Sequence, residues 1–401
     1  MTLLCKIFIS LIMLYSSQTL AMSFDEYLLR LENHPQVLLH LSGAQSSDQL
    51  SKAAMGLPDP TIILGVDNLP VDNPKFDQFL PSSKVFGFKQ MIPSYALRKA
   101  RSGKQQNISI KQKLIAEYVK ANLKAYLITA LVELEKVKKL EQYSKRQLKL
   151  YKSLEDYFKG KLEAGNAIYG RFSEVDVERV EVEQELNNLR SERVAIEAEL
   201  VRLVDEVPDI VISDVPAMQW NYDLGQVYPV RIMEGNIKVA SSGVEIAEKS
   251  YQPNYDIQAL YKQREEGESF SGDDWFSLQT SISIPLWYHS NQKPKLHAAR
   301  LVKQKTEFSL DDTRRSWQKQ LTVIASQRDT CFANIKLLQN KYKAIKSLVS
   351  SIQRNYEAGS AELESVLDAQ INELNIAASL VKQESQFLKL SASFNSHIIP
   401  R

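Results

Sequence analysis

The stretch SLQTSISIPLWYHSNQK, Ser277–Lys293, decides the fold that this sequence predicts. Up to Pro285, apolar positions alternate with polar ones: Phe276, Leu278, Thr280, Ile282 and Ile284 against Ser277, Gln279, Ser281 and Ser283. Successive side chains of a strand point to opposite faces, so this pattern predicts a strand with one apolar and one polar face. Proline lacks the N–H that a ladder needs, so the strand ends there. A lone strand is not stable and needs partners.

Three other segments predict those partners. Residues 255–262 alternate in the same way and form the nearest hairpin mate. Residues 61–66 and 85–92 are fainter copies of the pair, and each pair is joined by a polar loop. The sequence therefore predicts two strand pairs, at 61–92 and 255–284.

Helical periodicity dominates the rest of the chain. Apolar positions step by alternating four and three residues, as in coiled coils, through residues 182–203, 324–352 and 363–388. A less regular stripe without proline covers 94–158. Helices of about 60 residues reach on the order of 90–100 Å, which suits a rod or tube. The fold class is mainly α with a small β part, and Cys331 is expected in a helical seam.

The amino-acid sequence also predicts an internal duplication. LPDPTIILGV over QPNYDIQALY, FKQMIP over TSISIP, YFKGKLEAGN over SIQRNYEAGS and SEVDVE over SVLDAQ all align at offsets between 192 and 195. We expect a first repeat at 22–204, with a helix, the strand pair 61–92 and a helical hairpin 94–204. A linker at 205–229 precedes a second repeat at 230–401, with a helix, the strand pair 255–284 and a hairpin 287–392. Pro93 and Pro285 mark the strand-to-helix boundaries.

The N-terminus predicts export. Residues 1–21 contain one lysine, an apolar run and a small-residue cleavage pattern, which is typical of a signal peptide; an uncleaved membrane anchor is the alternative. Cys331 is then the only cysteine of the mature chain, which excludes an internal disulfide. A net charge of +2 without low-complexity tracts gives no sign of nucleic-acid binding.

The strands have the length that a tilted strand needs to cross a bilayer, although soluble hairpins show the same alternation. Aromatic residues bracket them as interfacial girdles would: Phe79 and Trp275 at one end, Tyr95, Trp287 and Tyr288 at the other. Four strands cannot close a barrel, and open edges cannot face lipid. Three copies would supply twelve strands and twelve long helices.

At these motifs the chain resembles the outer membrane factor (TolC-like) family of efflux exit ducts, most clearly in LPDPTIILGV, DDWFSLQTSISIPLWYHSNQKPKLHAAR and YEAGSAELESVLDAQINEL. SIPL followed by NQ is most similar to the branch that serves heavy-metal exporters, although the N-terminal cysteine that often anchors that branch to lipid is not evident. The resemblance implies a homotrimer in the outer membrane of a Gram-negative cell, with a twelve-stranded β-barrel, an α-barrel extending into the periplasm, and an adaptor and an inner-membrane pump as partners.

No catalytic constellation is present: the sequence has no Walker glycine loop, GxSxG or HExxH, and its five histidines have no ligand spacing. We therefore expect no enzyme, no cofactor and no bound metal. A conduit needs only weak sites, so metal transport stays open.

Candidate functional residues lie near the predicted hairpin tips. Asp368 and its counterpart Asp176, with Glu364 and Glu174, would form carboxylate rings that favour cations in a trimer; solvated surface carboxylates are the alternative. Gly165 and Gly359 serve the turns, where an adaptor would bind. The rival functions are a periplasmic coiled-coil scaffold and an adaptor subunit, neither of which has a channel.

Overall fold

The structure, a computed structural model, describes residues 22–400, so the predicted signal peptide lies outside the described residues. The elements in chain order are α2 (Phe24–Glu32), α3 (Pro35–Met55), β1 (Thr61–Asp67), β2 (Ser83–Ile92), α4 (Tyr95–Glu163), α5 (Tyr169–Val204), the short η1 (Leu224–Gln226), α6 (Tyr228–Lys249), β3 (Asn254–Gln263), β4 (Trp275–Ser283), α7 (Gln292–Glu357) and α8 (Leu363–Ser396). The described chain is mainly helical with four antiparallel strands, which confirms the predicted fold class at this level.

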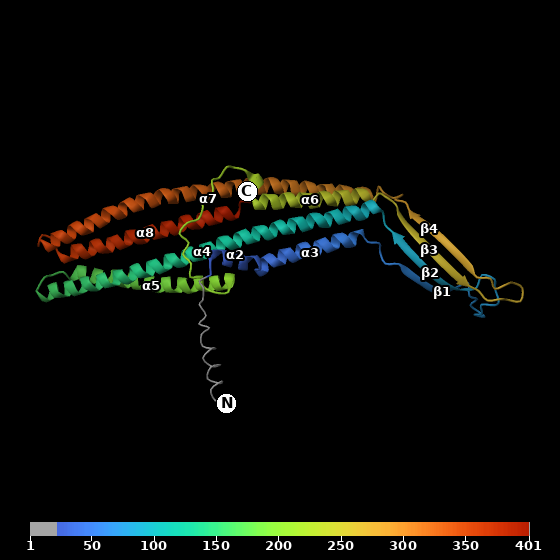
Figure 1. Cartoon of the computed structure of the whole chain (residues 1–401), viewed down its shortest axis with the longest axis horizontal. Helices are drawn as coiled ribbons and strands as arrows, with labels where there is room; N and C mark the ends of the chain where they lie inside the picture. Colours follow the sequence, from blue (N-terminus) through green and yellow to red (C-terminus); the bar gives the residue numbers. More distant parts are fainter. Residues whose placement is uncertain (1–21, 401) are drawn as a thin grey trace, which may run out of the picture. The chain divides into compact units, whose positions relative to one another are not determined.

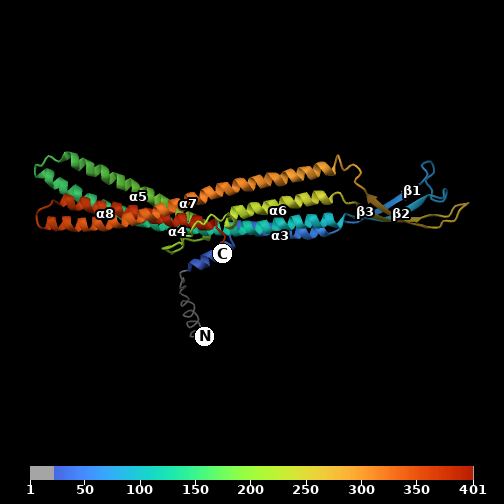
Figure 2. The ribbon, with the colours of Figure 1, turned by 90° about the horizontal axis from the view of Figure 1, so that it is seen from above.

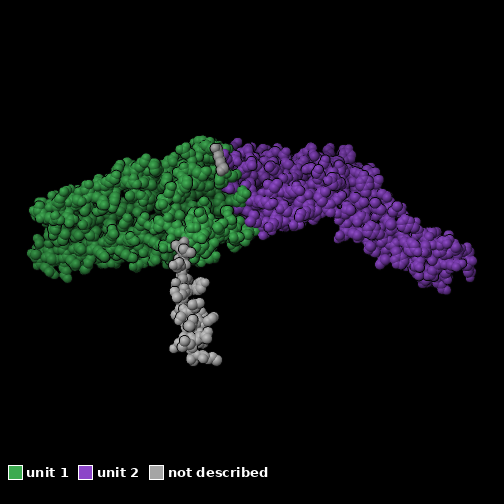
Figure 3. Space-filling model, in the orientation of Figure 1, with its two compact units in different colours: residues 1–38, 117–223, 318–401 green, residues 39–116, 224–317 purple. Residues whose placement is uncertain are grey.

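The chain divides into two compact units (Figure 3). Among the described residues, unit 1 contains 22–38, 117–223 and 318–400, and therefore holds both helical hairpin turns. Unit 2 contains 39–116 and 224–317, and therefore holds the sheet and the helices next to it. Within unit 1, both views place the α4–α5 turn and the α7–α8 turn at the same end (Figures 1 and 2).

Long helices form because their apolar stripes face one another. On α7, the predicted seam is the buried face: Cys331, Ile335, Ile345 and Val349 are all at most 9 % exposed. Cys331 is thus a seam residue, as expected. Seam packing of this kind buries apolar area at about 25 cal/mol per Å², which stabilises helices that would be marginal alone.

Arg328 is the one charged residue in this buried stripe, and its contacts explain it. Its Nη1 donates to the Met218 carbonyl oxygen at 2.6 Å, and its guanidinium lies 5.3 Å from the centre of the Phe394 ring. Residues 207–223 form neither helix nor strand, so Arg328 on α7 holds this extended segment against the helices of unit 1.

The sheet has the strand order β1-β2-β3-β4, with every neighbour antiparallel (Figure 1). The predicted hairpin mate is confirmed, with Ala259 opposite Leu278, and Phe88 opposite Ala259 joins the two strand pairs. Residues directly opposite share a face, so the apolar face and the polar face each run across all four strands. Within the described residues, β1 and β4 are edges with one strand neighbour each.

The boundary prolines behave differently. After Pro93, α4 begins at Tyr95, as expected. After Pro285, residues 286–291 form a turn, and α7 begins at Gln292 rather than near 287. The Ser290 N–H donates to the Trp287 carbonyl oxygen at 3.2 Å, three residues back, and the Lys293 N–H donates to the Tyr288 carbonyl oxygen at 2.8 Å, five residues back. These bonds interrupt the four-residue ladder of an α-helix, so the helix starts late.

The element order α3, β1, β2, α4, α5 is followed after residue 223 by α6, β3, β4, α7, α8. This element order matches the two halves that the sequence predicts. The duplication itself stays a prediction.

Candidate functional site

The two hairpin turns use the same backbone geometry. Gly165 has φ +87° and Gly359 has φ +74°. This left-handed backbone conformation is unfavourable for residues that carry a Cβ. At each turn the glycine N–H donates three residues back, Gly165 to Leu162 at 3.0 Å and Gly359 to Tyr356 at 2.9 Å. The next N–H reaches five residues back, as in a Schellman cap. Both glycines therefore end their helices.

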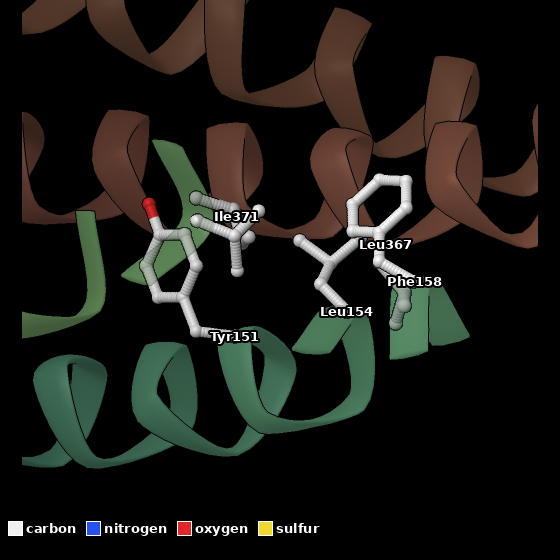
Figure 4. Close-up of a cluster of buried hydrophobic side chains, with 6 residues drawn as sticks. Tyr151, Leu154, Phe158, Leu367 and Ile371 are labelled. Carbon is white, nitrogen blue, oxygen red and sulfur yellow. The ribbon is translucent and has the colours of Figure 1, made fainter. Parts of the chain in front are cut away.

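An apolar cluster fastens the two hairpins just behind the turns (Figure 4). Tyr151, Leu154 and Phe158 of α4 face Leu367 and Ile371 of α8, and Val175 of α5 completes the buried set. Leu154 is fully buried and Phe158 is 1 % exposed. This core places the first turns of α5 and α8 side by side.

A single arginine then gathers carboxylates from both hairpins. Arg171 of α5 lies 3.2 Å from Glu364 through Nε and 3.1 Å from Asp368 through Nη2, both on α8. Its Nη1 lies 3.1 Å from Glu174 and 3.6 Å from Glu178, both on α5. Four carboxylates share one guanidinium, so this Arg171 cluster is strongly acidic.

The electrostatics follow from that imbalance. Burial lowers the pKa of Arg171, but the hydrogen bond with Glu174 and the charge of Asp368 outweigh it, and the pKa is raised. Burial raises the pKa of the Glu178 carboxyl, and neighbouring Glu174 and Asp368 raise it further. Burial, with the charges of Glu178 and Asp368, raises the pKa of Tyr151 to about 12.

A second link joins the end of α4 to the start of α8. Lys161 Nζ lies 2.6 Å from Glu362, and the Tyr157 hydroxyl donates to the same carboxylate at 2.9 Å. The Lys161 ion pair, followed by the Tyr157 hydrogen bond, lowers the pKa of the Glu362 carboxyl.

Three of the four predicted carboxylates meet here: Glu174, Glu364 and Asp368. Asp176 does not, because it pairs at 2.6 Å with Arg179 on its own helix. Sequence reasoning missed Arg171 and Glu178. The signal for Arg171 was its place three residues before Glu174, an i,i+3 spacing that puts opposite charges side by side.

The three predicted interface aromatics have different surroundings. Trp275 pairs in register with Lys262, which puts it on the polar face with Ser277 and not on the apolar face with Phe276. The strict alternation of β4 already implied this placement. Trp287 is 76 % exposed. The Tyr288 ring lies against the His289 ring, with ring centres 4.0 Å apart and the two planes inclined by 33°.

Among residues 22–400, no group of His, Cys, Asp or Glu side chains has an arrangement that could hold a metal ion. No described helix has an apolar stretch long enough to span a bilayer.

Comparison with known proteins extends these observations. Residues 230–394 match the sequence model of the family described as outer membrane efflux protein. A search of the curated proteins found no match.

Solved structures match over almost the whole chain. The outer membrane protein VceC from Vibrio cholerae aligns with a TM-score of 0.73 at 15 % identity, covering 94 % of this chain and 96 % of its own. The Campylobacter jejuni CmeC outer membrane channel gives 0.72 at 13 %, with 93 % and 85 % covered. The open-state MtrE outer membrane channel of Neisseria gonorrhoeae gives 0.72 at 13 %, with 92 % and 88 % covered. At these identities the likeness establishes the fold, which this chain shares with these outer-membrane proteins.

Proposed function

We propose that this chain belongs as a whole to the outer membrane efflux family and that three copies form an exit duct. In this assembly the duct lies in the outer membrane of a Gram-negative cell, extends into the periplasm and passively conducts substrates to the exterior. The observation that carries the proposal is a four-stranded sheet with two open edges and one exposed apolar face, joined to long helical hairpins.

The apolar face of the sheet supports a lipid contact. Its large side chains are exposed in the single chain, with Leu64 at 72 %, Phe276 at 70 % and Leu278 at 67 %. So much apolar surface on one sheet face marks an interaction with a partner or with lipid. The opposite face carries the ion pairs Lys89–Asp256 and Lys262–Asp67, as the wall of a water-filled lumen would.

The open edges support assembly from several copies. Unpaired backbone groups cannot face hydrocarbon, so β1 of one copy must pair with β4 of the next. Three copies give a closed barrel of twelve strands, each copy contributing its four.

The Arg171 cluster supports a cation-selective gate at the periplasmic mouth. Its carboxylates outnumber its guanidinium, and three copies around an axis would form an acidic ring. The exposed turns at Gly165 and Gly359 offer the contact surface for an adaptor, which links the duct to an inner-membrane pump. Heavy-metal cations are the proposed cargo; an acidic mouth that binds them weakly fits conduction.

A disulfide experiment tests the assembly directly. Strands in a sheet are about 4.8 Å apart, so β1 and β4 of one chain are separated by roughly 14 Å, too far for a disulfide. Cysteine pairs scanned along β1 and β4 should therefore cross-link only between copies and give covalent dimers and trimers in the outer-membrane fraction. The matched control, Phe88→Cys with Ala259→Cys, joins directly opposite residues of β2 and β3 and should give a monomer.

The purified trimer should also form channels in planar bilayers. A protein that fractionates with soluble periplasm and gives no cross-link between copies would favour the scaffold or adaptor alternatives. Loss of metal tolerance on deletion of the gene tests the cargo.

A further inference from the structure

One buried arginine joins the two loops at the far end of the sheet, residues 68–82 and residues 264–274. Arg264 is 7 % exposed. Its Nη1 donates to the Leu80 carbonyl oxygen at 2.9 Å, its Nε donates to the Asp273 carbonyl oxygen, and its guanidinium lies 4.0 Å from the centre of the Trp275 ring. A buried guanidinium is costly unless its donors are satisfied, so these contacts hold the two loops together.

The joined loops cover the polar face and leave the apolar face open. Val85 and Trp275 both pair with Lys262, which places them on the polar face. There Val85 is 8 % exposed, and Ser83 is fully buried with no hydrogen-bond partner for its Oγ. On the apolar face at the same height, Phe276 is 70 % exposed. The buried contacts of the loops therefore lie on the polar face, whereas the apolar face stays exposed at this height.

Close packing between the loops agrees with this arrangement. A Cβ built at Gly267 would overlap the Asp77 carbonyl oxygen of the other loop and the Phe270 ring. The first loop is also closed on itself, because the Ser82 hydroxyl donates to the Asn68 carbonyl oxygen at 2.9 Å. The two loops thus form one packed unit around Arg264.

We infer that the Arg264-held loops narrow the outer mouth of the duct and limit the size of solutes that pass it. The inference rests on the proposed function, in which the polar face lines the channel. Three copies would place three such loop pairs inside the barrel opening, at the end opposite the helices. Arg264 acts as a positioning residue: it holds the loops and does not itself select the solute.

Accessibility from outside the cell tests this inference. Gln258, on the polar face of β3 deeper in the sheet, is replaced by cysteine as a reporter. Intact cells are treated with a small maleimide or with a bulky polymer-linked maleimide. We expect the small reagent to label Gln258→Cys and the bulky reagent not to. Adding Arg264→Gln should let the bulky reagent label it as well.

Matched variants separate the possible outcomes. Phe276→Ala changes the apolar face at the same end of the sheet, where this side chain is 70 % exposed, and should leave labelling unchanged. Gly267→Ala disturbs the packing between the loops without changing Arg264, and it should also admit the bulky reagent. This second variant keeps the test valid if Arg264→Gln assembles poorly. Equal bulky labelling before and after these changes would overturn the inference. Labelling by neither reagent would instead overturn the channel itself.

Discussion

Replacing Arg171 by Gln should loosen the contact between the two hairpin tips. Among the described residues, Arg171 of α5 is the only cation that forms ion pairs with both Glu364 and Asp368 of α8. Its loss removes two cross-helix ion pairs and leaves their carboxylates facing Glu174 and Glu178. The tips should therefore open more often than in the parent protein.

The magnitude follows from the exposure of the partners. The side chains of Arg171, Glu364 and Asp368 are 27 %, 29 % and 42 % exposed, so each pair contributes in the range of partly solvated pairs, about 0.2–1 kcal/mol. Two pairs, with the added repulsion among four carboxylates, give a local destabilisation of about 1–2 kcal/mol. That difference corresponds to an increase in the open population of roughly 5- to 30-fold.

Hydrogen exchange of the tip amides measures this population. In Arg171→Gln, exchange in residues 160–175 and 357–370 should accelerate by that factor at low salt, and by less at high salt because ions screen the charges. Arg179→Gln is the matched control, since the ion pairs of Arg179 within residues 22–400 are with Asp176 and Glu183 of its own helix. Unchanged exchange in Arg171→Gln, or an equal acceleration in Arg179→Gln, would refute the cross-helix link.

Three further substitutions, at the gate, in the core and at a turn, and one pH effect are also predicted. Asp368→Ala should raise conductance or reduce cation selectivity in planar bilayers; unchanged currents would remove Asp368 from the gate. Leu154→Ala, at a fully buried position, should lower the free energy of unfolding by about 2–5 kcal/mol in denaturant titrations. A smaller decrease in that free energy would mean that the surrounding side chains collapse into the cavity. Gly359→Ala should cost about 1 kcal/mol because φ is +74°, and an unchanged unfolding midpoint would contradict the strain. Burial lowers the pKa of His397 from 6.5 to about 4, so on acidification the unfolded chain binds this proton before the folded chain does, and stability should fall as pH drops from about 6.5 to 4. His397→Gln should reduce this fall when thermal unfolding is measured across that pH range. An identical fall in the variant would rule out His397 as its source.

Local patterns predicted most of the architecture. The four-three stripe on α7 and the alternation from Phe276 to Ser283 are properties of consecutive residues, and the residues of both patterns form the helix and the strand that their periods predict. The α7 start was misplaced because the turn after Pro285 depends on carbonyl contacts of Trp287, which no periodicity encodes.

The candidate site was predicted only in part. Asp368, Glu364 and Glu174 could be selected from their positions near glycine turns. Their common partner Arg171 could not, because that contact requires α5 and α8 to lie side by side.

By itself, the sequence determined which segments are helices and strands, which strand face is apolar and where the glycine turns fall, because these follow from side-chain spacing and backbone preference along the chain. Only the tertiary structure decided that β2 pairs with β3, that Arg171 joins the two hairpins and that Arg264 folds both loops over the polar face. Those features join residues far apart in the chain, and their contacts exist only once the helices and strands have packed.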